Sequence, residues 1–266
     1  ENVLSEFFIK HRDEVIDVSV FEYDEKGVMD IMREEGKEEG IKEGKTEAKI
    51  EIFKGMMKKL DKSAEEVLDM VERYLEIESI LNIDSTFSTE LDYIVVRDAK
   101  DIRPLVDRLR EVWKIGEDPI NNIIELLEEN KIKVIEIDAD NSFDGLSGFI
   151  GGKCPFIILN KNFLPERKRF TAAHELGHLL LNIDPVLSSK KKEYLCNRFA
   201  NEILISESVF INLIGNSRKD ISLKELIDIQ CQFGVSIDAL MYKAKELNII
   251  TESRLKTYYI KKNRIS

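Results

Sequence analysis

The chain has 266 residues, of which 43% are hydrophobic and 34% charged, and its formal net charge is −11. This length allows one or two domains with a buried core. No apolar run approaches the roughly 18–20 residues of a membrane helix, and no secretory signal peptide is recognisable. The three cysteines are far apart and form no Cys-x-x-Cys pair, which is typical of reduced thiols. We therefore expect a cytoplasmic protein without membrane contact, disulfides or a cysteine metal site.

Most of the excess negative charge lies at the start of the chain. Residues 1–80 contain 23 acidic and 13 basic residues, a balance that disfavours nonspecific binding to nucleic acid. Gly36, Gly40 and Gly44 recur at a four-residue step among alternating acids and bases, which favours a solvated and marginal helix. We expect a helical charged arm over residues 1–60 that acts as a spacer or, alternatively, in oligomerisation. The arm also resembles the C-terminal tail of recombination-promoting nuclease and transposase-like proteins, without their nuclease core.

The next part of the chain mixes helical and strand patterns. A capping-box pattern at residues 63–66 predicts a helix that continues to about residue 81. Alternation of polar and apolar residues over 131–137 predicts a strand. The glycine-rich stretch 145–153 lacks the spacing of a phosphate-binding loop, and we expect hairpin turns there. The remaining expected elements are a strand at 93–96, helices at 104–115 and 119–129, and an edge strand at 155–160.

The sequence His174-Glu175-Leu-Gly-His178 lies within a helix predicted over residues 165–181, and it contains two of the three histidines of the chain. A step of four residues is close to one helical turn, so both imidazoles project from one face. There they can bind one tetrahedral Zn²⁺. Glu175 follows the first ligand and can act as general base toward a water on the metal. The alternative is a buried helix with two incidental histidines, because so short a motif recurs by chance.

A third metal ligand is expected from a helix predicted over residues 190–205. Glu193 and Glu202 compete for this role and, nine residues apart, face opposite sides of the helix. Glu193 shares its face with small and apolar residues that suit packing against the first helix, whereas the neighbours of Glu202 indicate a solvated side chain. We expect Glu193 to be the ligand, with Asp184 in the preceding loop as the fallback. Tyr194 is turned about 100° away and is not expected at the site.

The last third of the chain is predicted to be helical. Ser206 caps one helix, a capping box at residues 222–225 begins another, and Gly234 separates it from a helix at 237–247. Helix, short turn and helix is also the outline of a DNA-binding unit, but the second helix offers only Lys243 and Lys245 as cations. We favour a packing module over a DNA-reading one.

Residues from about 66 to 262 resemble the ImmA/IrrE family of zinc metallopeptidases. The resemblance implies a zincin-like α+β domain with a small sheet. We expect the charged helical arm to precede this domain and a helical C-terminal module to follow it. It implies His174, His178 and Glu193 as zinc ligands and Glu175 as base. The resemblance lies in Phe143-Asp-Gly-Leu-Ser-Gly148, Pro155-Phe-Ile-Ile-Leu-Asn160, residues 169–181, Glu193-x-x-Cys-Asn-Arg-Phe-Ala200, Phe233-Gly-Val-Ser-Ile237 and Ala244-Lys-Glu-Leu-Asn-Ile-Ile250.

The family resemblance also implies a substrate, a helix-turn-helix transcriptional repressor of a mobile element or stress response. Many relatives begin with a DNA-binding domain, whereas this chain has the acidic arm there, so direct binding of nucleic acid is not expected. The alternative function is a non-enzymatic, metal-stabilised regulator that binds a protein partner or DNA through its C-terminal helices. The expected regions are an arm (1–60), a helical linker (61–118), a metallopeptidase core (119–205) and a C-terminal helical module (206–266).

Overall fold

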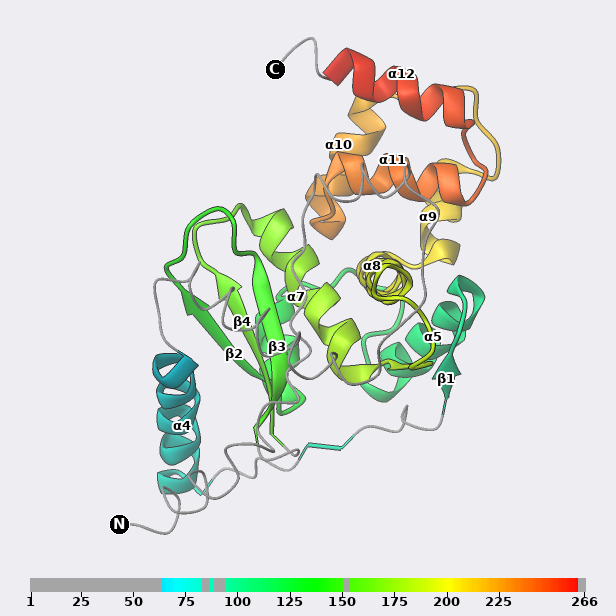
Figure 1. Cartoon of the computed structure of the whole chain (residues 1–266). Coiled ribbons are helices and arrows are strands. Elements are labelled where there is room, and N and C mark those ends of the chain that lie inside the picture. Colours follow the sequence, from blue (N-terminus) through cyan, green and yellow to red (C-terminus); the bar gives the residue numbers. More distant parts are fainter. Residues whose placement is uncertain (1–63, 83–86, 89–93, 151–153, 263–266) are drawn as a thin grey trace.

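The computed structural model describes residues 64–82, 87–88, 94–150 and 154–262, and the predicted arm lies outside these ranges. The described residues combine helices with a small sheet, so the expected α+β class is confirmed. A three-stranded sheet lies between helix α4 (Ala64–Ile80) on one side and the helix pair α7 (Pro165–Leu180) and α8 (Ser189–Leu204) on the other (Figure 1). None of the described helices is both long and apolar enough to cross a bilayer.

The three-stranded sheet contains β2 (Lys133–Ile137), β3 (Gly145–Ile150) and β4 (Cys154–Asn160) in the order β2-β4-β3. Strand β4 is parallel to β2 and antiparallel to β3. The expectation of an edge strand at residues 155–160 is therefore wrong, because β4 lies in the centre and is buried along almost its whole length.

The glycine-rich stretch was also expected to form turns, but its first six residues form edge strand β3. Glycine is needed here because helix α7 passes close to the strand. A Cβ atom on Gly145 would lie 2.7 Å from Cγ2 of Thr171, and 2.9 Å from the backbone oxygen of Ile158. Glycine at this position thus allows helix and strand to approach closely, and it does not form a turn.

Helix α4 covers the outer face of the sheet (Figure 1). The buried ammonium of Lys133 on β2 donates to Glu78 at 2.6 Å, and it also lies 5.6 Å from the centre of the Tyr74 ring. Tyr74 and Glu78 are four residues apart and so share one face of the helix. Ile77 and Ile80 lie away from this face and are 57% and 71% exposed, because the face with Tyr74 and Glu78 meets the sheet.

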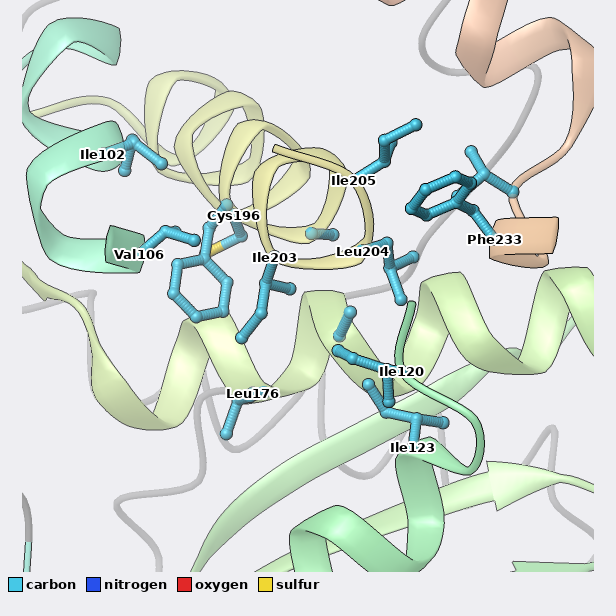
Figure 2. Packing of buried hydrophobic residues seen from close by; sticks show 14 of the residues in the cluster. Ile102, Val106, Ile120, Ile123, Leu176, Cys196, Ile203, Leu204, Ile205 and Phe233 are labelled. Carbon is cyan, nitrogen blue, oxygen red and sulfur yellow. The ribbon is translucent and has the colours of Figure 1, made fainter. Parts of the chain in front are cut away.

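The main core lies between α7, α8 and helix α5 (Ile102–Val112), as Figure 2 shows for Leu176, Cys196, Ile102 and Val106. The helices α7 and α8 approach closely at Gly177, where an added Cβ atom would lie 3.2 Å from the ring of Phe199. Other elements of this part are the 3₁₀ helix Ala99–Asp101, α6 (Ile123–Glu129), and the short parallel pair β1 (Val95–Val96) and β5 (Asn182–Ile183).

Two predicted helices begin at positions that differ from the sequence patterns. Helix α5 begins two residues before Pro104, which therefore occupies its first turn. Helix α6 begins four residues after residue 119, because the side chain of Asn122 accepts hydrogen bonds from the backbone N–H groups of Ile124 and Glu125 and so caps the helix there.

The C-terminal helices are α9 (Glu207–Ile214), α10 (Leu223–Phe233), α11 (Ile237–Glu246) and α12 (Glu252–Lys262). The predicted caps are confirmed, since Ser206 caps α9 and Ser222 with Glu225 forms a capping box on α10. Gly234 ends α10 with a φ of 62° in the left-handed region. The division of the chain into the four expected regions stays a prediction.

A buried ion pair connects the C-terminal helices to α8. Lys243 of α11 is 1% exposed, and its ammonium donates to Glu202 at 2.8 Å and to the carbonyl of Ile205 at 2.5 Å. The expectation that Glu202 is solvated is therefore wrong, because α11 covers this part of α8. Lys243 is also withdrawn from any surface that could contact a phosphate, so one of the two cations of the supposed DNA-reading helix has a structural role.

Candidate metal centre

Three side chains from two helices converge between α7 and α8. His174 and His178 lie one turn apart on α7, and Glu193 lies in the first part of α8. The Nε2 atom of His174 is 3.2 Å from one Glu193 oxygen, and that of His178 is 3.6 Å from the other. Their candidate ligand atoms all lie within 4.8 Å of one another. The structure thus groups the three residues that the sequence suggested as ligands.

The local sequence explains how the helices bring these groups together. Pro165 occupies the first turn of α7, where its missing N–H group costs no hydrogen bond. The side chain of Ser188 accepts from the backbone N–H of Lys191 and caps α8 at the end of the loop that joins the helices. Gly177 on α7 lies against Cys196 and Phe199 of α8. Because no side chain separates the helices there, Glu193 can reach the histidines.

Two further residues of α8 hold the imidazoles, and the sequence reasoning did not identify this role. Nδ1 of His174 is 2.9 Å from Oδ1 of Asn197, and Nδ1 of His178 is 3.4 Å from Sγ of Cys196. When Nδ1 carries the proton on both rings, these contacts leave each Nε2 lone pair directed at the cluster. The role of Asn197 could have been predicted from its spacing, because it lies four residues after Glu193 on the same face of the helix.

The electrostatic environment puts two of the three groups in the protonation state that a metal requires. Burial alone raises the pKa of Glu193, but its close contacts with both histidines more than offset this and lower the pKa to about 2. Burial, reinforced by His174, lowers the pKa of His178 to about 4. Burial also disfavours the charged form of His174, yet Glu193 and Glu175 together raise its pKa.

The arrangement of donor atoms fits a bound cation. The two Nε2 atoms lie 3.0 Å apart, and lone pairs held this close repel unless a proton or a metal ion lies between them. Oε1 of Glu193 is buried and has no hydrogen-bond partner among the described residues. Two imidazoles and one carboxylate are a typical ligand set for catalytic zinc, which keeps a fourth position for water or substrate. The three residues could therefore hold a metal ion, and their role as ligands stays a prediction.

Glu175 lies beside this cluster but is not one of the three converging groups. Its side chain is fully buried, one of its oxygens accepts a hydrogen bond of 2.7 Å from Ser147 on β3, and the other has no partner among the described residues. Burial is the main reason that the pKa of Glu175 is raised to about 7. A carboxylate that binds and releases a proton near neutral pH can act as a general acid or base.

The fallback ligands lie away from the cluster in other interactions. Asp184 accepts from Arg97 at 2.9 Å and from the backbone of Val186 at 3.0 Å. Glu202 pairs with Lys243, as described above. Tyr194 donates from its hydroxyl to Glu246 of α11 at 3.2 Å, in agreement with the expectation that it turns away from the site.

A search of curated proteins gave no match. A solved structure of a Mycobacterium tuberculosis transcriptional regulator is similar to this chain with 14% identity and a TM-score of 0.39 over 55% of this chain. The match covers 47% of the regulator, about half its length, and a likeness this weak supports no functional argument.

Residues 127–245 match the model of the Peptidase_M78 family, described as an IrrE N-terminal-like domain. The match includes β2 to β4, both helices of the candidate metal centre and most of α11. All three candidate ligands, together with Glu175 and Ser147, lie inside it. Residues 127–245 of this chain are therefore similar to the IrrE N-terminal-like domain of this peptidase family.

Proposed function

We propose that this chain is a zinc-dependent endopeptidase that hydrolyses a peptide bond in a protein substrate. The observation that carries the proposal is the convergence of His174, His178 and Glu193 next to the buried carboxylate of Glu175. The match to the peptidase family model supports metallopeptidase chemistry at this site. Zinc is proposed as the metal because two imidazoles and a carboxylate suit its coordination.

The roles of the protein groups follow from their positions and protonation. His174, His178 and Glu193 hold the ion, which when bound supplies a Lewis acid for the carbonyl and lowers the pKa of water. Asn197 and Cys196 hold the rings so that Nε2 faces the ion. Glu175 accepts the proton of the attacking water and later donates it to the leaving amine. Its pKa of about 7 suits both transfers at neutral pH.

We propose a helix-turn-helix transcriptional repressor of a mobile element or stress response as the substrate, acted on in the cytoplasm. The resemblance of the motifs to the ImmA/IrrE family supports this substrate. Recognition of a protein rather than of DNA is supported by Lys243, whose ammonium is buried against Glu202. In the alternative function, a regulator without catalysis, the same metal site would only stabilise a binding surface.

Metal analysis is the first experiment. We expect about one zinc per chain in the purified wild type by elemental analysis, and its loss in both His178→Ala and Glu193→Ala. A wild type without zinc after mild purification would refute the proposed site and favour the non-enzymatic alternative. Zinc retained in Glu193→Ala alone would show that a different group supplies the third ligand.

Cleavage is tested by comparing cells that express the wild type with cells that express Glu175→Gln. Mass spectrometry of protein N-termini should find new ends in the wild type only, and we expect them within helix-turn-helix repressors. The matched control is Glu111→Gln, which changes an exposed residue of α5 in the same way and should cleave like the wild type. Equal cleavage by the wild type and by zinc-loaded Glu175→Gln would refute the catalytic role.

A further inference from the structure

The buried carboxylate of Glu175 is held by a group that comes from the sheet and not from the metal-binding helices. Ser147 lies on edge strand β3, is fully buried, and donates its hydroxyl to Oε2 of Glu175 at 2.7 Å. A hydrogen bond to a carboxylate at this distance is charge-assisted and stronger than one between neutral groups. It fixes one carboxylate oxygen and leaves the other, Oε1, without a hydrogen bond among the described residues.

The register of strand and helix explains why Ser147 can reach Glu175. Successive side chains on a strand point to opposite faces, and Leu146 belongs to the apolar cluster on the outer side of the sheet. Gly145 and Ser147 therefore face α7 together. Gly145 meets Thr171, which lies one helical turn before Glu175. Close approach at the glycine thus brings the serine hydroxyl within hydrogen-bonding distance one turn further along the helix.

We propose that Ser147 is a positioning residue that fixes the Glu175 carboxylate through Oε2, so that Oε1 is the oxygen presented to the reacting groups. This inference rests on the proposed peptidase function. The hydroxyl of Ser147 donates to Glu175 and not to any of the three candidate ligands, so its effect passes through Glu175. Loss of the hydroxyl releases the carboxylate without removing the metal site.

A pair of variants separates the hydroxyl from the space that it fills. Ser147→Cys keeps a similar volume but has only a weak donor, whereas Ser147→Thr keeps the hydroxyl. The probe is acetohydroxamic acid, a zinc-chelating compound whose N–H and O–H groups can donate to a neighbouring carboxylate. Its binding to zinc-loaded protein is measured by calorimetry, in the wild-type and Glu175→Gln backgrounds, after elemental analysis shows equal zinc contents.

We expect Ser147→Cys to weaken binding of the probe roughly tenfold, as for the loss of one hydrogen bond to a charged group. Ser147→Thr should bind the probe with an affinity within about twofold of the wild type, because it keeps the hydroxyl. In the Glu175→Gln background the effect of Ser147→Cys should be much smaller, because the amide keeps an acceptor for Ser147 but has no charged oxygen to present to the probe. With a cleavable substrate, the Cys variant should lower kcat and leave KM unchanged.

Several results would overturn the inference. The first is a Ser147→Cys variant that binds the probe as tightly as the wild type, and the second is an equal loss of affinity in the Glu175→Gln background. The others are loss of zinc from both Ser147 variants and a zinc-loaded wild type that does not bind the probe. Failure of the proposed function has a different signature. The single and double variants can show that the effects of Ser147 and Glu175 on probe binding depend on each other, while no protein is cleaved in cells. In that case the positioning role stands and the endopeptidase proposal fails.

Discussion

The burial of Glu175 should make the metal-free protein less stable at neutral pH than it would be with a neutral group at this position. Burial raises the pKa of its carboxyl from 4.5 to about 7, and each pKa unit corresponds to about 1.4 kcal/mol. Between these values the folded protein keeps a proton that the unfolded chain has lost, so stability falls as pH rises. The loss is complete above the folded-state pKa and amounts to about 3 kcal/mol.

Replacing Glu175 by Gln removes this ionisation while keeping an acceptor for Ser147. We therefore expect Glu175→Gln to match the wild type near pH 4.5 and to be more stable by up to about 3 kcal/mol at pH 8. The assay is urea unfolding of metal-free protein, followed by circular dichroism across this pH range. Glu111→Gln, at a side chain that is 72% exposed, should show no such trend. A stability difference that does not grow with pH would refute the reasoning.

Three further predictions concern the groups around the metal helices. Lys243→Ala leaves the carboxylate of Glu202 buried without its partner and should destabilise the protein by about 3–5 kcal/mol in urea unfolding; Lys245→Ala, at a partly exposed surface pair, should change stability by less than about 1 kcal/mol. Asn197→Ala removes the acceptor for His174 and should weaken zinc binding by about 10- to 100-fold in a competition assay with a chelator. The affinity of the wild type for zinc should fall as pH drops through the raised pKa of His174, because a proton then competes for Nε2; an affinity that does not change over this range would contradict the proposed ligand.

The helix of the candidate site could be predicted from the sequence because the pattern that identifies it lies within a few neighbouring residues. The step from His174 to His178 fixes a shared face whatever surrounds the helix. The comparison of Glu193 with Glu202 also rested on helical periodicity, and the structure places the first residue beside the histidines and the second on Lys243. The reason offered for excluding Glu202 was nevertheless wrong, because burial by a distant helix leaves no mark on its neighbours in sequence.

What the sequence did not predict depends on contacts between distant segments. Ser147 and Glu175 are separated by 28 residues, and nothing in the glycine-rich stretch indicates that a helix will pass over it. The same stretch was expected to form turns, since glycine favours them, but here glycine admits a close neighbour. The order of the strands, with β4 in the centre, is likewise decided by pairing across the sheet and not by the strand's own pattern.

The docking of α4 on the sheet has a practical consequence for anyone who expresses parts of this protein. A fragment that starts at residue 127, where the family match begins, retains Lys133 but lacks Glu78 and Tyr74. Without α4, the apolar cluster on the outer face of the sheet, which Met70 of that helix helps to cover, would be exposed to water together with Lys133. A fragment meant to fold should therefore begin no later than residue 64, because the unit that folds is larger than the part that sequence comparison recognises as a peptidase.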